Sequence, residues 1–126
     1  MTLQQMLQSH PMPGDLSPDV LRCIDTCIEC GPVRKSCADA YLGEQHVDAL
    51  VRCITLALNC SAICEVTAGV MLRRSGFDWT MARTQIDACA EACRICKMEC
   101  RDACLDSRAL PDVPKSALAV RKSAAP

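Results

Sequence analysis

Cysteine is the residue type in this chain whose number and spacing could do chemistry, with twelve among 126 residues. The cysteines fall into three sets whose members are mostly three, four or seven residues apart: Cys23, Cys27, Cys30 and Cys37; Cys53, Cys60 and Cys64; and Cys89, Cys93, Cys96, Cys100 and Cys104. At about 3.6 residues per turn, each set lies on one stripe of an α-helix. Thiolates are soft ligands that select Cu(I), zinc or iron–sulfur clusters. Three thiol stripes that face one another therefore predict an interior that holds soft metal ions.

The spacing favours Cu(I) among these metals. A structural zinc site takes four ligands, usually from paired C-x2-C units. The two such pairs here, Cys27/Cys30 and Cys93/Cys96, are far apart and belong to longer ladders. Iron–sulfur clusters favour cysteines on loops at fixed spacings. Cu(I) is satisfied by about two or three sulfurs, and a thiolate can bridge two ions, so a ladder can hold one ion after another.

Three other interpretations of the cysteines remain open. A zinc-binding or thiol-redox module would use only a few of them. A disulfide scaffold would need Cβ atoms about 3.5–4.5 Å apart, closer than the 5–6 Å of helical (i, i+4) pairs, although bridges between helices are possible. Free cysteine can also serve as a small buried hydrophobe in a core, although Leu or Val would fill a core better.

Composition and charge indicate which partners to expect. Fourteen basic and fifteen acidic residues leave a net charge of −1, which gives no electrostatic case for nucleic acid or an anionic membrane. The only aromatics, Tyr41, Phe77 and Trp79, provide no stacking platform for bases. Residues 1–13 lack the features of a secretory signal, and we expect no stretch to reach membrane-spanning length. We therefore predict a cytoplasmic protein with reduced thiols.

The elements that position the cysteines are predicted to be helices throughout. We expect an all-α, antiparallel, four-helix-bundle-like domain over residues 1–126, with three long cysteine-lined helices and a short N-terminal helix. Residues 1–16 form the short helix and a linker, residues 17–107 carry the cysteine-bearing helices, and residues 108–126 form a tail.

Capping residues set the expected boundaries. Ser17 and Pro18 open a helix that Gly43 closes, a second helix runs over about 45–74, and Asp78 caps a third that continues to about 107. Pro32 costs about 3 kcal/mol inside a helix. Because Cys30 and Cys37 stay in phase across it, we predict one kinked helix rather than two.

Two further features lie on the second long helix. Extending its thiol stripe by seven residues each way reaches His46 and Met71, whose imidazole and thioether bind copper more weakly than thiolate. We predict that they accept and release ions at opposite ends of the bundle, against the alternative of ordinary packing or exposure. A second apolar stripe, Val47, Val51, Ile54 and Leu58, predicts contact either with the N-terminal helix or tail or with another subunit, and we favour a homo-oligomer.

The chain resembles the cytosolic copper storage proteins from about Met6 to Cys104. The resemblance rests on LRCIDTCIEC and KSCADAYL, on RCITLALNCSAIC, on DACAEACRICKMEC, and on the connecting GFD. It implies a cysteine-lined four-helix bundle that stores and buffers Cu(I) in an assembly of bundles, without enzymatic activity. The cysteines at matching positions inherit the ligand role: Cys23, Cys27, Cys30, Cys37, Cys53, Cys60, Cys64, Cys89, Cys93, Cys96 and Cys100.

The chain departs from that family in two respects. Arg34 and Tyr41 stand where the family has further cysteines, and by helical phase they lie about 20° and about 0° from Cys23. For Arg34 we expect the kink at Pro32 to turn the side chain to solvent; the alternative is a guanidinium among the thiols that opposes copper loading. The family's fourth cysteine-bearing helix is not visible after Cys104, so either a terminal segment or a neighbouring chain closes the bundle.

Overall fold

The protein is described here from a computed structural model, in which residues 1–100 can be described. Within that range the secondary structure is entirely helical, which confirms the all-α prediction. The elements are α1 (Leu3–Gln8), α2 (Pro18–Leu42), the short 3₁₀ helix η1 (Val47–Leu50), α3 (Val51–Leu72) and α4 (Trp79–Cys100). Cys104, the expected end of the third long helix at about 107, and the expected tail lie outside the described residues.

Side-chain caps begin three of the helices, and two of these caps, Ser17 and Asp78, are at the predicted residues. Thr2 and Gln5 form a reciprocal capping box at the start of α1. The Ser17 hydroxyl accepts a hydrogen bond from the Val20 amide at 3.4 Å, and Pro18 follows as the first residue of α2. The Asp78 carboxylate accepts a hydrogen bond from the Thr80 amide at 2.8 Å and so caps α4.

The start of the second long helix was predicted too early. The chain forms a turn after Gly43, then η1, and α3 begins only at Val51 rather than near residue 45. Neither His46 nor Leu50 makes a side-chain cap hydrogen bond that would begin an α-helix there. The residues after α2 are used instead to reverse the chain direction.

Helix α2 is continuous through Pro32, as the phase of its cysteines predicts. Close packing supports it at this point. The Ser61 hydroxyl of α3 donates a hydrogen bond to the Gly31 carbonyl at 2.7 Å, and a Cβ on Gly31 would lie 3.0 Å from Glu65 Cγ. Lys35 and Glu65 form an ion pair at 2.8 Å one turn further along. The absence of a side chain on Gly31 therefore brings α2 and α3 together beside the proline.

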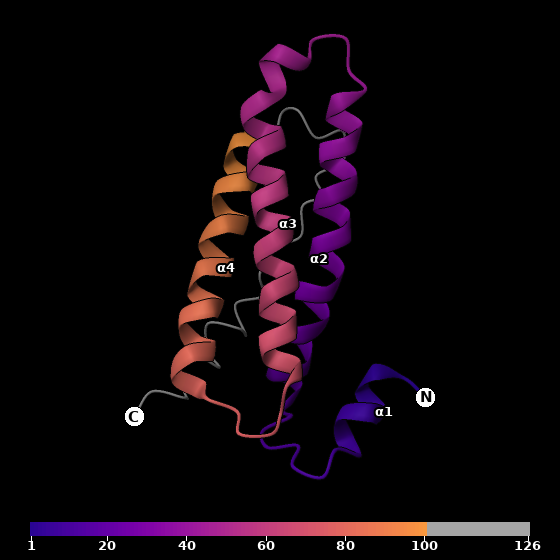
Figure 1. Ribbon diagram of the computed structural model, residues 1–126, viewed down its shortest axis with the longest axis vertical. Coiled ribbons are helices and arrows are strands. Elements are labelled where there is room, and N and C mark those ends of the chain that lie inside the picture. The colour runs from indigo at the N-terminus through magenta and orange to yellow at the C-terminus, as the bar shows by residue number, and fades with distance from the viewer. Residues whose placement is uncertain (101–126) are drawn as a thin grey trace.

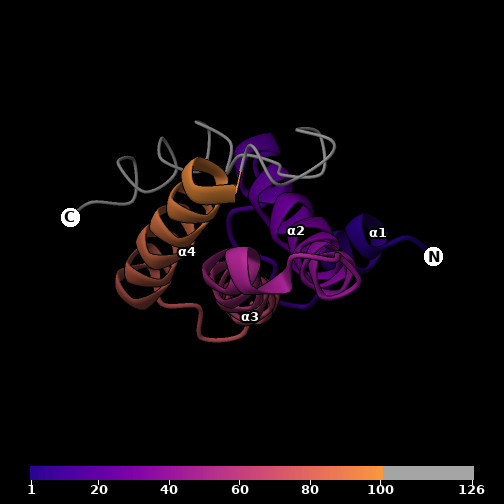
Figure 2. The ribbon, with the colours of Figure 1, turned by 90° about the horizontal axis from the view of Figure 1, so that it is seen from above.

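The three long helices alternate in direction, which confirms the antiparallel bundle (Figure 1). Helix α3 packs against both α2 and α4. Seen from above, α2 and α4 lie on either side of α3 (Figure 2). The inward faces of the three helices therefore converge along one axis, which is where the cysteine stripes point.

Helix α1 lies beside the end of the bundle where α2 begins (Figure 1). Arg74, just after α3, fastens the linker that joins α1 to α2. Its guanidinium donates hydrogen bonds to the carbonyls of Pro13 and Asp15, both at 2.8 Å, and lies 4.2 Å from the centre of the Phe77 ring. The N-terminal segment is thereby held against the lower end of the bundle.

One segment reaches the length and apolar composition needed to cross a membrane, contrary to the sequence prediction. It spans Val47–Leu72, which is η1 together with α3. Length and composition alone are weak grounds for a membrane span, since core helices of soluble proteins share them. Here α3 packs between two other helices and carries the exposed charges of Arg52 and Glu65.

Candidate metal centre

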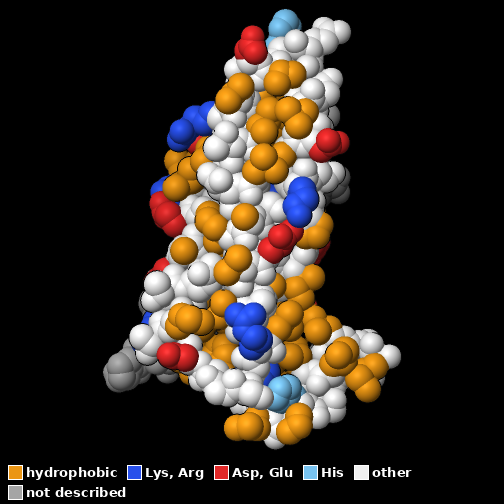
Figure 3. Space-filling model, viewed as in Figure 1, with side chains coloured by type: hydrophobic (Ala, Val, Ile, Leu, Met, Phe, Trp, Pro, Cys, Tyr) orange, Lys and Arg blue, Asp and Glu red, His pale blue; other side chains and the backbone are white. Residues whose placement is uncertain are grey.

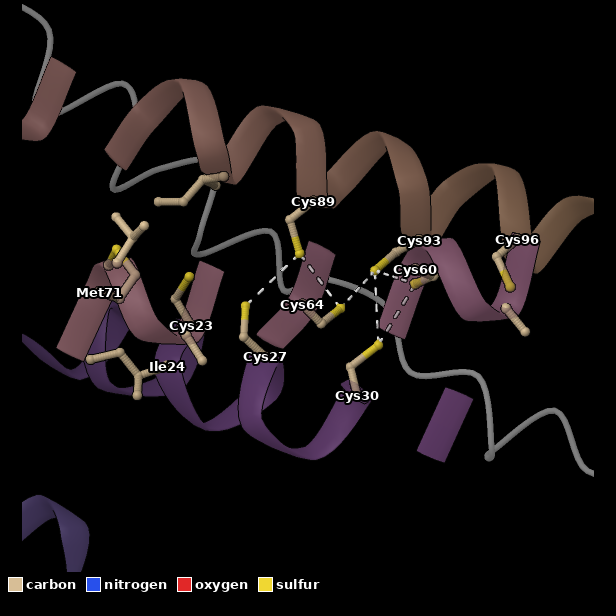
Figure 4. Close-up of a cluster of buried hydrophobic side chains, with 14 of the residues drawn as sticks. Cys23, Ile24, Cys27, Cys30, Cys60, Cys64, Met71, Cys89, Cys93 and Cys96 are labelled. Atoms are coloured by element: carbon tan, nitrogen blue, oxygen red, sulfur yellow. Dashed lines mark hydrogen bonds between the residues drawn. The ribbon is translucent and has the colours of Figure 1, made fainter. Parts of the chain in front are cut away.

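The three long helices turn their cysteines toward the common axis (Figure 4). Cys37 is half-buried, and the other cysteines of residues 1–100 are buried: Cys23, Cys27, Cys30, Cys53, Cys60, Cys64, Cys89, Cys93, Cys96 and Cys100. The predicted thiol-lined interior is therefore present in the described part of the chain. Polar side chains and charges lie mainly on the opposite helix faces, as expected of amphipathic helices.

Six of these sulfurs form a continuous network across all three helices. Consecutive Sγ atoms lie 3.4–4.0 Å apart: Cys27–Cys89 at 3.9 Å, Cys89–Cys64 at 3.7 Å, Cys64–Cys93 at 3.7 Å, Cys93–Cys60 at 3.4 Å, Cys93–Cys30 at 3.9 Å and Cys30–Cys60 at 4.0 Å. The network is a ladder and not a closed cage, because each pair leads to another pair along the axis (Figure 4).

Four sulfurs at one end of this network could hold a single ion of several kinds. The sulfurs of Cys30, Cys60, Cys64 and Cys93 all lie within 4.8 Å of one another. Four sulfurs bound tetrahedrally at about 2.3 Å would lie about 3.8 Å apart, so zinc fits here as well as copper. A single zinc ion would leave Cys89 and Cys27 unused, although their sulfurs extend the network beyond Cys64. Bridging Cu(I) ions would use them.

A second group of thiols lies beyond the network, toward the end where α3 begins. It consists of Cys96 and Cys100 of α4, Cys53 of α3 and Cys37 of α2. Two of them are tied to backbone: the Cys53 thiol donates to the Glu99 carbonyl at 3.4 Å, and the Cys100 thiol donates to the Cys53 carbonyl at 3.7 Å. These contacts orient the thiols inward.

The described cysteines are all free thiols. The shortest separation given above, 3.4 Å between Cys60 and Cys93, far exceeds the disulfide bond length of about 2.05 Å. A disulfide scaffold is therefore not the form of residues 1–100, and the sulfurs are available as ligands.

Contacts among the thiols shift their pKa values in opposite directions. Hydrogen bonds from Cys30 and its neighbours lower the pKa of Cys60, and a hydrogen bond from Cys27 lowers that of Cys89. Cys64 hydrogen-bonds to Cys30, Cys60 and others, which raises its pKa. Burial raises the pKa of Cys100 to about 12. Thiols with a raised pKa must release a proton before they bind a cation, and thiols with a lowered pKa ionise more readily.

Arg34 and Tyr41 both lie in the interior, so the expectation that Arg34 turns to solvent was wrong. The Arg34 side chain is 0 % exposed and Tyr41 is 4 % exposed. Because α2 runs through Pro32 without interruption, the helical phase of Cys30 is kept at Arg34. The kink that was expected to rotate it outward does not do so.

The structure separates the two weaker candidate ligands. Met71 is fully buried near Cys23 (Figure 4). It lies at the end of the thiol column, the line of inward-facing cysteines along the bundle axis, where α2 begins. His46 is exposed in the turn before η1, so its predicted place on the thiol face of a helix was wrong.

Sequence reasoning overlooked two small residues on the inward face of α3. Thr67, three residues after Cys64, is buried. Its hydroxyl donates to the Ile63 carbonyl at 2.7 Å and accepts from the side-chain Nε2 of Gln85 at 3.0 Å. Ala57, three residues before Cys60, is also buried. Their spacing from the cysteines was the available signal, because positions three apart share a helix face.

Comparisons with known proteins agree with this geometry. The profile of the copper storage protein family matches residues 17–122. The structure of the copper storage protein Ccsp from Streptomyces lividans, loaded with 10 copper equivalents, is similar with a TM-score of 0.83 and 30 % identity, over 96 % of this chain and 98 % of that one. A structure described as copper loading, with five coppers, of a cytosolic copper storage protein from the same organism has a TM-score of 0.67 and 31 % identity, over 83 % and 88 %. A search of curated proteins gave no significant match.

Proposed function

Because this chain belongs to the copper storage protein family, we propose that it stores several Cu(I) ions in the cytosol on thiolates of α2, α3 and α4, without enzymatic activity. The ligands proposed are all twelve cysteines: Cys23, Cys27, Cys30, Cys37, Cys53, Cys60, Cys64, Cys89, Cys93, Cys96, Cys100 and Cys104. The observation that carries the proposal is the six-sulfur network, in which every sulfur has a neighbour within 4.0 Å.

Storage of many ions follows from the continuity of this network. A thiolate that bridges two Cu(I) ions serves both, so neighbouring pairs along the axis can fill in succession. The helices hold the sulfurs in place before any ion arrives, which reduces the entropy that binding would otherwise cost. A protein that needed one structural ion would have no use for the pairs beyond the first four sulfurs.

Serine substitutions test the assignment of the ligands. Cys64→Ser removes a sulfur that contacts both Cys89 and Cys93, at 3.7 Å each, and should lower the number of tightly bound Cu(I) ions. Cys37→Ser alters a half-buried thiol outside the network and serves as the matched control, with a smaller loss. Equal capacity in Cys64→Ser and the unaltered protein would contradict the proposal.

His46 and Met71 are proposed to pass ions to and from the two ends of the thiol column. Met71 supports this role as a buried thioether near Cys23, and His46 as an exposed imidazole beside the opposite end. His46→Ala or Met71→Leu should slow Cu(I) uptake, or removal by a chelator, and leave total capacity nearly unchanged. Unchanged rates in both variants would refute the role.

Self-association is proposed for the outer face of α3. Val51 and Leu58 of the second stripe are 56 % and 47 % exposed, and apolar side chains recur along the face that α3 and α2 present in Figure 3. Sedimentation should give a mass of at least two chains, which Leu58→Glu lowers. A monomer at micromolar concentration would contradict this part of the proposal.

A single zinc ion on Cys30, Cys60, Cys64 and Cys93 is the second candidate, favoured by the 4.8 Å limit on their separations. In that case zinc would bind as tightly as copper and only once per chain, and the remaining thiols would be free for redox chemistry.

A further inference from the structure

Arg34 is a charged residue that lies inside the thiol-lined interior. Its side chain is fully buried, and its three guanidinium nitrogens, Nε, Nη1 and Nη2, have no hydrogen-bond partner within the usual distance limits. A buried guanidinium without a partner is costly and is normally retained only with a compensating negative charge. The buried Arg34 guanidinium therefore requires a negatively charged neighbour.

The register of the helices places Arg34 one turn beyond the contacts of Cys30 with Cys60 and Cys93. Cys30 lies 4.0 Å from Cys60 and 3.9 Å from Cys93, and Arg34 follows Cys30 by one turn of α2. At the corresponding level α3, which runs antiparallel, offers the small buried Ala57, and α4 offers Cys96. The guanidinium of Arg34 therefore lies within reach of Cys96, which is the thiol that interacts with it most strongly.

The ionisable groups that act most strongly on Arg34 are thiols. Burial lowers the pKa of Arg34, but the interactions with Cys96, and then with Cys60 and Cys30, raise it by more, so the side chain stays positively charged. The same charge acts on Cys100, one turn further along α4. The largest of these interactions come from thiols and none of them from a carboxylate.

The charge of a copper–thiolate site depends on how many sulfurs each ion takes. When one Cu(I) ion displaces one thiol proton, the charge of the site does not change. When one Cu(I) ion is held by two thiolates, two protons leave and one positive charge arrives, so the site carries a net charge of −1. A fixed cation nearby has no net electrostatic effect on the first arrangement, which is uncharged, and stabilises the second, which is negatively charged. This reverses the expectation that an inward Arg34 opposes copper.

We propose that Arg34 is the resident counter-cation of a copper site near Cys96 that has one thiolate more than it has copper ions. The proposal rests on the copper-storage function proposed above. Arg34 itself would bind no metal, and its positive charge would favour the copper–thiolate arrangement that carries a net negative charge. Bridged, neutral copper–thiolate pairs would then occupy the six-sulfur network, and the thiolate-rich site would lie at its boundary with Cys96 and Cys100.

Three substitutions test the role of the charge, each compared with the unaltered full-length protein in anaerobic Cu(I) titrations against a competing chelator. Arg34→Leu removes the charge and should weaken one Cu(I) ion per chain by about tenfold to a hundredfold, leaving the other ions unchanged. Arg34→Lys keeps the charge and should recover most of that affinity. Arg34→Gln, which is polar and neutral, should behave as Arg34→Leu and serves in its place if the leucine variant does not fold. Circular dichroism establishes folding in each case.

The outcomes separate this inference from the storage function itself. Weakening of one ion in the neutral variants, with recovery in Arg34→Lys, supports the counter-cation. Unchanged affinities in Arg34→Leu, or tighter binding, overturn it while leaving storage intact. If the unaltered protein binds no more than one Cu(I) ion, the storage proposal fails before the role of Arg34 is reached.

Discussion

At the scale of single residues, the thiols of this protein differ from one another because of what surrounds them. Burial raises the pKa of Cys100 to about 12, whereas hydrogen bonds from neighbouring thiols lower the pKa of Cys60. A sulfur with a raised pKa still carries its proton at neutral pH, and a metal ion must displace that proton to bind. The thiols of the network therefore differ in how readily they lose a proton, even though they are all of one residue type.

Copper affinity should rise with pH for this reason. The raised pKa keeps Cys100 protonated over the neutral pH range, so each unit of pH lost makes the displacement of its proton up to tenfold harder. Chelator competition between about pH 6 and pH 9 should show Cu(I) affinity falling as pH falls. An affinity that does not change with pH would mean that the binding thiols are already ionised, contrary to the raised pKa of Cys64 and Cys100.

At the scale of the elements, the helices were largely predictable from caps and periodicity, and their errors have local causes. Ser17, Pro18 and Asp78 begin α2 and α4 as expected, because capping depends on neighbours in the sequence. The start of α3 was misplaced because the turn before η1 lacks a side-chain cap. The orientation of Arg34 could not be settled from sequence, since it depends on how α2 packs through Pro32.

The hydrogen bond between Ser61 and Gly31 is predicted to stabilise α2 where Pro32 interrupts its backbone bonding. Ser61→Ala should lower the free energy of unfolding of the copper-free protein by about 1 kcal/mol, measured by urea denaturation. Thr84→Ala is the matched control, because the Thr84 hydroxyl also donates to a backbone carbonyl, that of Thr80 at 3.1 Å, but on an exposed surface. Equal losses in the two variants would show that the contact between α2 and α3 contributes nothing special.

At the scale of the whole molecule, the proposed copper site and the hydrophobic core are formed by largely the same residues. The thiols that are proposed to bind copper also fill the space between α2, α3 and α4, together with a few aliphatic side chains such as Ile24 and Ile86. The cysteine ligands were therefore predictable from sequence as a set, because a ligand stripe and a core stripe share one helical period. The order in which their sulfurs touch was not, since it depends on the relative shift of three helices.

The copper-free protein should already be folded. Its helices have their own caps and apolar contacts, unlike a zinc finger, which folds only when it binds metal. Far-UV circular dichroism of the copper-free and copper-loaded protein should therefore differ little. A copper-free spectrum typical of a random coil would show that the metal, and not the helices, organises the thiols.

The number of ions bound per chain tests the central claim most directly. Reduced protein is titrated anaerobically with Cu(I) in the presence of a competing chelator, and zinc is titrated in parallel. If the six-sulfur network stores copper, about three or more Cu(I) ions should bind tightly per chain, because each needs two or three sulfurs and neighbouring ions can share them. Zinc should bind in smaller number. Saturation at a single Cu(I) ion, with zinc held equally well on Cys30, Cys60, Cys64 and Cys93, would contradict the account.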